Sequence, residues 1–214
     1  MLNELIKHGF YINLDKRTDR RIHIESELTH LGLQNNVRRF PAILNKDNPA
    51  LGCTQSHLNC LEIARDNNWD LVWICEDDAF INDPTEFNQA LVRILSSRIQ
   101  WDVILLGGVI IGDVMPVNRA CDKIITGCQT TTGYIVRRHY YERLISNIKE
   151  GGMKLSENPG ERTKYAIDRY WIPLQQQHNW YILSKNATLT QYGGYSDIEN
   201  QDVDYKQKMY HSTF

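Results

Sequence analysis

The sequence predicts an α/β domain, and three observations lead to that prediction. The 214 residues are 42% hydrophobic and 23% charged, which is the composition of a globular domain with a core of its own. Short apolar runs typical of strands alternate several times with segments in which apolar residues recur at helical spacing. Several of these runs end in polar or glycine-rich turns, as strands do where they leave a sheet.

The first half of the chain alternates between expected strands and expected helices. The strands are Gly9–Leu14, Val37–Leu44 and Leu71–Cys75. The first helix starts with Thr18 as its cap and stops at Gly32, and its apolar face is Ile22, Ile24, Leu28 and Leu31. On one face of the second helix lie Cys53, His57, Cys60, Leu61 and Ala64. Asp83-Pro84 opens the third, whose buried stripe is Phe87, Leu91, Ile94 and Leu95.

The second half continues the pattern with shorter elements. A wholly apolar strand, Val103–Leu106, ends at Gly107-Gly108. The remaining expected elements are strands within residues 124–136, a helix over 140–148, a loop over 151–163, a helix over 165–171 and a strand over 180–183. We therefore predict one domain over residues 1–200, followed by a peripheral polar tail over residues 201–214.

Charge and cysteine content exclude several classes of protein. A net charge of -2 gives no general attraction to nucleic acid or anionic lipid, so no nucleic-acid partner is expected. The five cysteines form no CxxC pair and predict reduced thiols rather than a disulfide framework. The sequence has neither a signal-peptide pattern nor an apolar run long enough to span a bilayer. The expected location is therefore the cytoplasm, in a protein of bacterial or viral origin.

Three consecutive acids, Glu76-Asp77-Asp78, are the strongest chemical feature of the sequence. They follow an apolar strand directly, and open α/β sheets bind ligands at the carboxyl ends of their strands. Adjacent carboxylates favour a hard divalent cation with oxygen ligands. Because side chains alternate along extended chain, Glu76 and Asp78 are expected to face one way and Asp77 the other. The alternative interpretation is a solvated acidic turn.

Three further segments offer candidate functional groups. Arginines around the helix start at Thr18 are suited to hold a phosphate, or they simply pair with neighbouring acids. His57 cannot form a catalytic pair with its neighbour Ser56, because adjacent side chains on a helix diverge. Asp168 lies in an apolar, aromatic stretch, where burial would raise its pKa and suit it as a general base, or it pairs with Arg169.

Read in order, six blocks resemble the signature segments of glycosyltransferase family 25. They are YINLDKRTDRR, LGCTQSHLNC, LVWICEDDA, TTGYIV, AIDRYW and QYGGYSDIEN, spanning roughly Phe10 to Asn200. That family contains bacterial lipooligosaccharide galactosyltransferases and collagen hydroxylysine galactosyltransferases. The resemblance implies a GT-A-type, Rossmann-like domain with a mixed, mostly parallel central sheet flanked by helices. It also implies an inverting, metal-dependent hexosyltransferase that takes galactose or glucose from a UDP-sugar donor, with Mn²⁺ or Mg²⁺ as cofactor.

The resemblance also assigns roles to individual residues. Asp78 matches the metal ligand, with Glu76 or Asp77 reaching the ion or the ribose, and Asp168 lies where an inverting enzyme could place its base. The residues that match the nucleotide-sugar pocket are Asn13, Leu14, Arg17, Gln55, Ser56, His57, Glu76 and Asp77. Arg17 or Arg20 can share the charge of the departing UDP, and the Gln191–Asp197 block could close the sugar site. His211, His178 and Gln191 all remain open as a third metal ligand.

The acceptor is left open by the sequence. A lipooligosaccharide or other glycan and a hydroxylysine on a collagen-like chain are all compatible with the resemblance. Two alternatives to a glycosyltransferase also stay open. One is a degenerate protein that binds nucleotide sugar or glycan without turnover, and the other is a metal-dependent phosphohydrolase. The absence of a second acidic cluster counts against the phosphohydrolase, and the intact acidic triplet with Asp168 counts against the degenerate protein.

Overall fold

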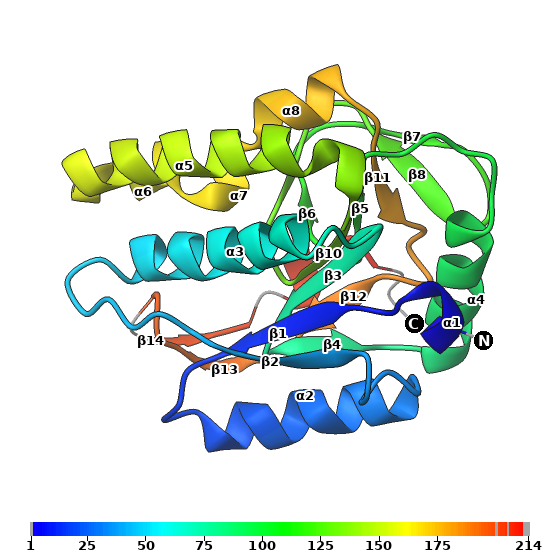
Figure 1. Ribbon diagram of the computed structural model, residues 1–214, viewed down its shortest axis with the longest axis horizontal. Coiled ribbons are helices and arrows are strands. Elements are labelled where there is room, and N and C mark those ends of the chain that lie inside the picture. Colours follow the sequence, from blue (N-terminus) through cyan, green and yellow to red (C-terminus); the bar gives the residue numbers. More distant parts are fainter. Residues whose placement is uncertain (1, 200, 205, 212–214) are drawn as a thin grey trace.

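An eight-stranded sheet runs through the molecule between layers of helices (Figure 1). The computed structural model describes residues 2–199, 201–204 and 206–211. The strand order is β2-β1-β3-β10-β5-β11-β8-β7. Its strands are β1 (Gly9–Asn13), β2 (Val37–Pro41), β3 (Leu71–Glu76), β5 (Val103–Leu105), β7 (Val114–Pro116), β8 (Cys121–Ile124), β10 (Gly133–Arg137) and β11 (Trp180–Leu183). The α/β class that the sequence predicts is confirmed.

The sheet is mixed, as expected, but the expectation that it is mostly parallel is wrong. Three neighbouring pairs are parallel, namely β1–β2, β1–β3 and β5–β11. The other four are antiparallel. Six strands nevertheless point the same way, because only β8 and β10 run against the others and each is flanked on both sides. The apolar run of β10 looks like that of its neighbours, so its direction could not be read from the sequence.

Three two-stranded sheets extend the central one. The strand β4 (Ala79–Ile81), which follows the acidic triplet, pairs with β12 (Leu189–Gln191). The other two pair β6 (Val109–Ile110) with β9 (Cys128–Gln129), and β13 (Gly194–Ser196) with β14 (Gln201–Val203). The pairing of β4 with β12 brings a C-terminal segment directly beside the acids.

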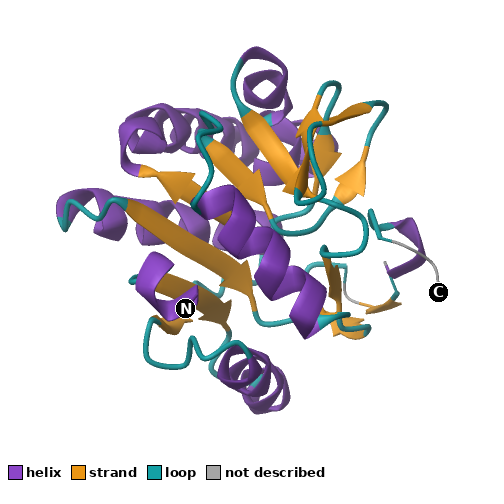
Figure 2. Cartoon of the chain, turned by 90° about the vertical axis from the view of Figure 1, so that its right-hand side faces the viewer, coloured by secondary structure: helices purple, strands orange, loops and turns teal. Residues whose placement is uncertain are grey.

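Helices cover both faces of the sheet (Figure 2). One face carries α3 (Pro49–Asp66), α5 (Tyr141–Glu157), α7 (Ile167–Tyr170) and α8 (Ile172–Gln177), with α6 (Arg162–Tyr165) beside them. The other face carries α1 (Leu2–Leu5), α2 (Thr18–His30) and α4 (Pro84–Leu95). Alternate residues of β3 feed the two cores, with Trp73 facing α4 and Ile74 in the core beneath α3.

The helix limits follow capping chemistry closely at some positions and not at others. Asp83 caps α4 as predicted, because its carboxylate accepts hydrogen bonds from the backbone of Thr85 and Glu86. The prediction for α2 is less accurate. Its cap position is Arg17 rather than Thr18, and Ile22, expected in the core, is 71% exposed. The expected loop over 151–163 is wrong, because α5 continues to Glu157, a 3-10 turn covers Pro159–Glu161 and α6 begins at Arg162.

The segment after residue 200 lies against the domain where the structure describes it. Met209 is buried, and the Tyr210 hydroxyl donates to Asp122 at 2.5 Å. Asn200, where the predicted domain ends, and residues 205 and 212–214 of the predicted tail lie outside the described residues. The boundary between domain and tail therefore stays a prediction. Among the residues described, no helix has both the length and the apolar character needed to cross a membrane.

Candidate active site

A cavity of about 840 Å³ opens at the carboxyl ends of β1 and β3. Its walls come from the start of α3, the loop before β10, the helix α7 and the segment 191–199. Seven of the predicted site residues line it, namely Leu14, Ser56, His57, Glu76, Asp77, Asp78 and Asp168. Residues far apart in sequence thus share one cavity, as expected for a site at the carboxyl edge of an α/β sheet.

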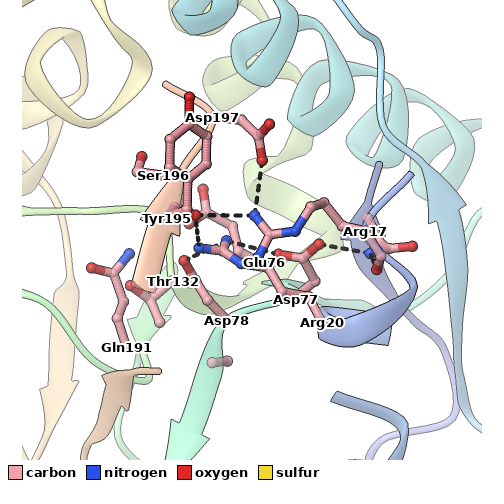
Figure 3. Close-up of polar contacts among 12 residues, drawn as sticks. Arg17, Arg20, Glu76, Asp77, Asp78, Thr132, Gln191, Tyr195, Ser196 and Asp197 are labelled. Atoms are coloured by element: carbon pink, nitrogen blue, oxygen red, sulfur yellow. Dashed lines mark hydrogen bonds and ion pairs between the residues drawn. The ribbon is translucent and has the colours of Figure 1, made fainter. Parts of the chain in front are cut away.

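The Arg20 guanidinium lies between two of the three acids (Figure 3). Its Nη1 donates to Asp77 at 3.2 Å and to Asp78 at 3.0 Å, and its Nη2 donates to the Tyr195 carbonyl at 2.9 Å. The expectation that Asp77 faces away from Asp78 is therefore wrong. The strand ends at Glu76, so the two aspartates occupy a turn in which side chains no longer alternate.

The pKa of Asp78 is raised even though Arg20 lies beside its carboxylate. Burial and the negative charge of Glu76 raise the pKa of Asp78 to about 8, and Arg20 opposes that rise. One carboxylate oxygen, Oδ1, is buried and has no hydrogen-bond partner within the described residues. An ionised carboxylate with a free buried oxygen is costly unless a cation or donor comes to it.

Gln191 supplies a second buried oxygen without a partner on the cavity wall. Its Oε1 accepts no hydrogen bond from the described part of the chain, and the side chain lines the cavity. The β4–β12 pairing holds Gln191 opposite Ala79, and the Tyr192 N–H donates to the Asp78 carbonyl at 2.6 Å. Carboxylate and amide oxygens are the ligands that hard divalent cations prefer. The free oxygens of Asp78 and Gln191 therefore fit such a cation.

The two histidines considered as a third ligand do not line the cavity. His178 precedes β11, which begins at the opposite edge of the sheet from the end of β3, and its ring packs on Tyr140. His211 follows Tyr210, whose N–H donates to the Gly108 carbonyl. Of the three candidates, only Gln191 is a cavity residue.

Asn13 and Arg17 support the site from behind rather than from its surface. Asn13 is buried and donates to the Asp77 carboxylate at 2.7 Å, while its own oxygen accepts from Arg39 at 2.9 Å. Arg17 donates to Asp197 at 2.9 Å and to the Tyr195 carbonyl at 3.0 Å, as Figure 3 shows. In this arrangement both residues hold other parts of the cavity in place.

The predicted residues of α3 separate into three kinds. Ser56 donates to the Gly52 carbonyl and accepts from the Ile43 N–H, so its hydroxyl joins the helix to the preceding loop. Gln55 does not line the cavity. His57 is fully buried, with Nδ1 2.9 Å from the Tyr134 hydroxyl and Nε2 3.4 Å from Glu76.

Asp168 lies at the start of α7, across the cavity from α2. Burial raises its pKa above the ordinary value, and a hydrogen bond from the Thr130 N–H at 3.1 Å together with the charge of Arg169 opposes the rise. Thr130 has a φ of 79°, which is rare for a β-branched residue. The loop before β10 thus accepts backbone strain at the residue whose N–H points to Asp168.

Sequence reasoning missed three residues around the acids. Thr131 donates to Glu76 at 2.6 Å, Tyr134 contacts His57, and Cys53 lies with its sulfur 3.7 Å from Glu76. The polar interruption QTTTG inside an apolar stretch indicates only a break between strands. Its threonines can be recognised as a functional loop only once the pairing of β3 with β10 is known.

Comparison with known proteins gives a family for the chain. The family model described as glycosyltransferase family 25 (LPS biosynthesis protein) matches residues 47–157. That range includes the acidic triplet and the loop before β10 but ends before Asp168. No curated protein matches the sequence significantly.

Solved structures resemble the fold at low sequence identity. A glycosyltransferase involved in the glycosylation of the major capsid of PBCV-1 matches with a TM-score of 0.52 and 14% identity, over 90% of this chain and 95% of that one. A mannose-1-phosphate geranyltransferase from Thermus thermophilus has a TM-score of 0.44 and 10% identity, over 85% of this chain. This chain spans 59% of that protein's length. A197 from STIV has a TM-score of 0.47 and 9% identity, over 97% and 95% of the two chains.

Proposed function

This chain belongs to glycosyltransferase family 25 and is a glycosyltransferase, and we propose that it transfers a hexose from a UDP-sugar to an acceptor hydroxyl with inversion. The proposed hexose is galactose or glucose, and the proposed acceptors are a glycan, a lipooligosaccharide or a hydroxylysine-type hydroxyl. One observation carries the proposal. A single cavity has the acids Asp77 and Asp78 beside an arginine on one wall and the half-buried acid Asp168 on another.

A divalent cation, Mn²⁺ or Mg²⁺, fits the oxygens that the cavity offers. Asp78 and Gln191 would hold it through their buried oxygens, which have no partner in the described part of the chain. Asp77 lies beside Asp78 and binds the same arginine, Arg20. When bound, such an ion offsets the negative charge that develops on a departing diphosphate. Glu76 is the other predicted metal ligand. Its carboxylate accepts a hydrogen bond from Thr131 and lies beside the ring of His57.

The positive charge of Arg20 suits a diphosphate leaving group, whereas the negative charges of Asp77 and Asp78 suit the cation that would accompany it. Arg20 already contacts both aspartates and a backbone carbonyl, so it stays within reach of anionic oxygens entering the cavity. Leu14 lines the same wall and offers an apolar contact for a nucleoside. We propose that Arg20 is the main basic residue for the diphosphate, with Arg17 holding the segment 195–197 over it.

Asp168 is proposed as the general base. It would accept the proton of the acceptor hydroxyl, a contribution typically worth on the order of 100- to 10,000-fold in rate. Its burial and its hydrogen bond from Thr130 hold the carboxylate in one orientation facing the cavity. Asp168→Asn should leave donor binding unchanged and remove transfer to the acceptor.

Calorimetry with UDP tests the donor half of this proposal. UDP is titrated into the wild-type protein with Mn²⁺ and again with a chelator, and the titrations are repeated with UDP-galactose and UDP-glucose. Binding that requires Mn²⁺ and is lost in Asp78→Asn supports the metal and donor assignments. Mn²⁺-independent binding would remove the cation from the proposal, and an absence of binding under both conditions would remove UDP.

The transfer half needs a separate measurement. Once a donor is known, the anomeric configuration of the product shows whether the reaction inverts or retains. An inverted product lost in Asp168→Asn supports the assigned base. A retained configuration, or full activity in Asp168→Asn, would contradict it.

A further inference from the structure

Three potential metal-binding side chains lie close together on the α3 wall of the cavity, on the side away from Arg20. Cys53 and His57 lie one turn apart on α3, which places them on the same helix face. Glu76, at the end of β3, lies opposite them. The Cys53 sulfur, one nitrogen of His57 and one oxygen of Glu76 all lie within 4.8 Å of one another, and the three residues all line the cavity.

The separations between these atoms are long for hydrogen bonds. His57 Nε2 lies 3.4 Å from Glu76 Oε1, whereas a bond from a protonated histidine to a carboxylate is typically about 2.7–2.9 Å. A tetrahedral zinc ion has bonds of about 2.0–2.1 Å to nitrogen and oxygen and about 2.3 Å to sulfur, so its ligand atoms stand roughly 3.3–3.5 Å apart. The His57–Glu76 distance and the 3.7 Å from Cys53 to Glu76 are close to that spacing.

His57 and Glu76 also make the kind of additional hydrogen bonds that orient metal ligands in proteins. The Tyr134 hydroxyl lies 2.9 Å from Nδ1 of His57, and both side chains are fully buried. A ligating histidine almost always uses its second ring nitrogen in such a hydrogen bond, which fixes the ring. Thr131 donates to Glu76 at 2.6 Å and fixes the carboxylate in the same way.

We propose that Cys53, His57 and Glu76 form a zinc site, separate from the oxygen-only site of Asp78 and Gln191. Sulfur and imidazole ligands select zinc, whereas carboxylate and amide oxygens select magnesium or manganese. Three protein ligands leave a fourth position that faces the cavity. Zinc would join α3 to the end of β3 on this wall of the cavity. The proposal does not depend on which sugar nucleotide the enzyme uses.

Cobalt substitution tests the site directly. Metal-free protein is titrated with Co²⁺ while the visible and near-ultraviolet spectrum is recorded, because thiolate ligation produces a sulfur-to-cobalt charge-transfer band. Competition with Zn²⁺ then gives the zinc affinity. We expect one cobalt per chain, a thiolate band in the wild type and displacement of that band by Zn²⁺.

Matched variants separate this site from other thiols and from the proposed donor metal. Cys53→Ala and Cys53→Ser should lose the band, while Cys60→Ala, a buried cysteine of the same helix, should keep it. Tyr134→Phe should weaken zinc binding by about 10- to 100-fold. Asp78→Asn should retain the band even where it loses Mn²⁺-dependent UDP binding, so the two proposals fail independently.

The circular dichroism spectrum of each variant shows whether it is folded. A wild-type protein that gives no thiolate band with Co²⁺ would overturn the proposal. The same conclusion would follow if folded Cys53→Ala or Cys53→Ser kept the full band, since the sulfur ligand would then lie elsewhere. In either case Cys53 and His57 would only pack beside Glu76 and hold no metal.

Discussion

At the scale of single residues, the buried carboxyl group of Asp78 lowers the stability of the native state. Its native pKa of about 8 lies above the ordinary value of 3.8 because of burial and the charge of Glu76. Between these pH values the native state binds more protons than the unfolded state, so the free energy of unfolding contributed by this group falls as pH rises. The stability cost is therefore largest above pH 8 and absent below the ordinary pKa.

We expect Asp78→Asn to be at least as stable as the wild type when a chelator is present, and to gain most at high pH. Thermal unfolding at pH 6 and at pH 8.5 measures this difference, with the exposed Asp113→Asn as a control for loss of a carboxylate. A variant that melts well below the wild type at both pH values would show that Asp78 is held mainly by Arg20 and stabilises the fold.

Arg169 offers a prediction about the pH dependence of transfer. Burial raises the pKa of Asp168, and the positive charge of Arg169 lowers it. Since a general base must be ionised, the rate of transfer should rise with pH through a pKa above 3.8. Arg169→Met removes the positive charge and should move this rise in rate to higher pH. A profile of kcat/KM against pH measures the shift. A rise that is unchanged or moved to lower pH would contradict the assignment of Asp168 as base.

At the scale of secondary-structure elements, two adjacent glycines of α5 give opposite predictions. A Cβ on Gly151 would lie 2.8 Å from the Tyr170 ring, whose hydroxyl is fixed by Glu150. A Cβ on Gly152 would make ordinary contacts, the nearest at 3.4 Å to Thr54. We expect Gly152→Ala to stabilise the protein by about 0.5–1 kcal/mol, because alanine is the better helix former.

Gly151→Ala should instead destabilise it by roughly 1–3 kcal/mol, because Tyr170 has to move. Tyr170 belongs to α7, the helix that carries Asp168, so transfer activity should fall as well. Urea unfolding of the two variants measures whether each substitution raises or lowers the free energy of unfolding. Equal effects on stability would mean that the helix can shift away from α7.

The same glycines show why the end of α5 could not be predicted from the sequence. Gly151-Gly152 followed by a polar segment is typical of a loop, but the packing of Gly151 on Tyr170 requires a residue without a side chain inside a helix. Local signals were sufficient for β1, β3 and α4, whose limits depend on nearby polar caps and apolar runs. The direction of β10 and the pairing of β4 with β12 depend on contacts between distant segments, which local patterns do not specify.

The candidate site divides in the same way. The acids and Asp168 were recognisable because carboxylates at a strand end or in an apolar stretch are chemically unusual. The position of Arg20 between Asp77 and Asp78 depends on how α2 lies across the end of β3. Gln191 was one of three open candidates until β12 placed it beside the acids.

At the scale of the whole molecule, the N-terminal and C-terminal parts of the chain meet over the cavity. Asp197 accepts from Lys16 at 2.6 Å and from Arg17 at 2.9 Å, and these residues follow β1, the first strand of the sheet. Arg162, before α7, holds Glu199 at 2.7 Å on the other side. Ion pairs thus attach the segment 192–199 to both walls of the cavity, in addition to the stacking of Tyr192 on His23.

This attachment should depend on Asp197 and on pH. Burial raises the pKa of Asp197, but its bonds to Lys16 and Arg17 outweigh that effect and hold the pKa below its ordinary value. A carboxyl group with a lowered native pKa stabilises the native state above its ordinary pKa, and that contribution disappears as pH falls through the native pKa. The segment should therefore remain closed at neutral pH and loosen only in acid.

Hydrogen exchange of segment 192–199 at neutral pH tests the role of Asp197. Partly exposed ion pairs are each worth about 0.2–1 kcal/mol and Asp197 makes two of them, so Asp197→Asn should speed exchange there by roughly two- to thirtyfold and leave the sheet unchanged. Asp202→Asn, an exposed acid in the partner strand β14, should have no such effect. Donor affinity should fall with closure in Asp197→Asn only. Unchanged exchange in that variant would mean that the hydrogen bonds from the Arg17 and Arg20 side chains to the Tyr195 carbonyl are sufficient to hold the segment.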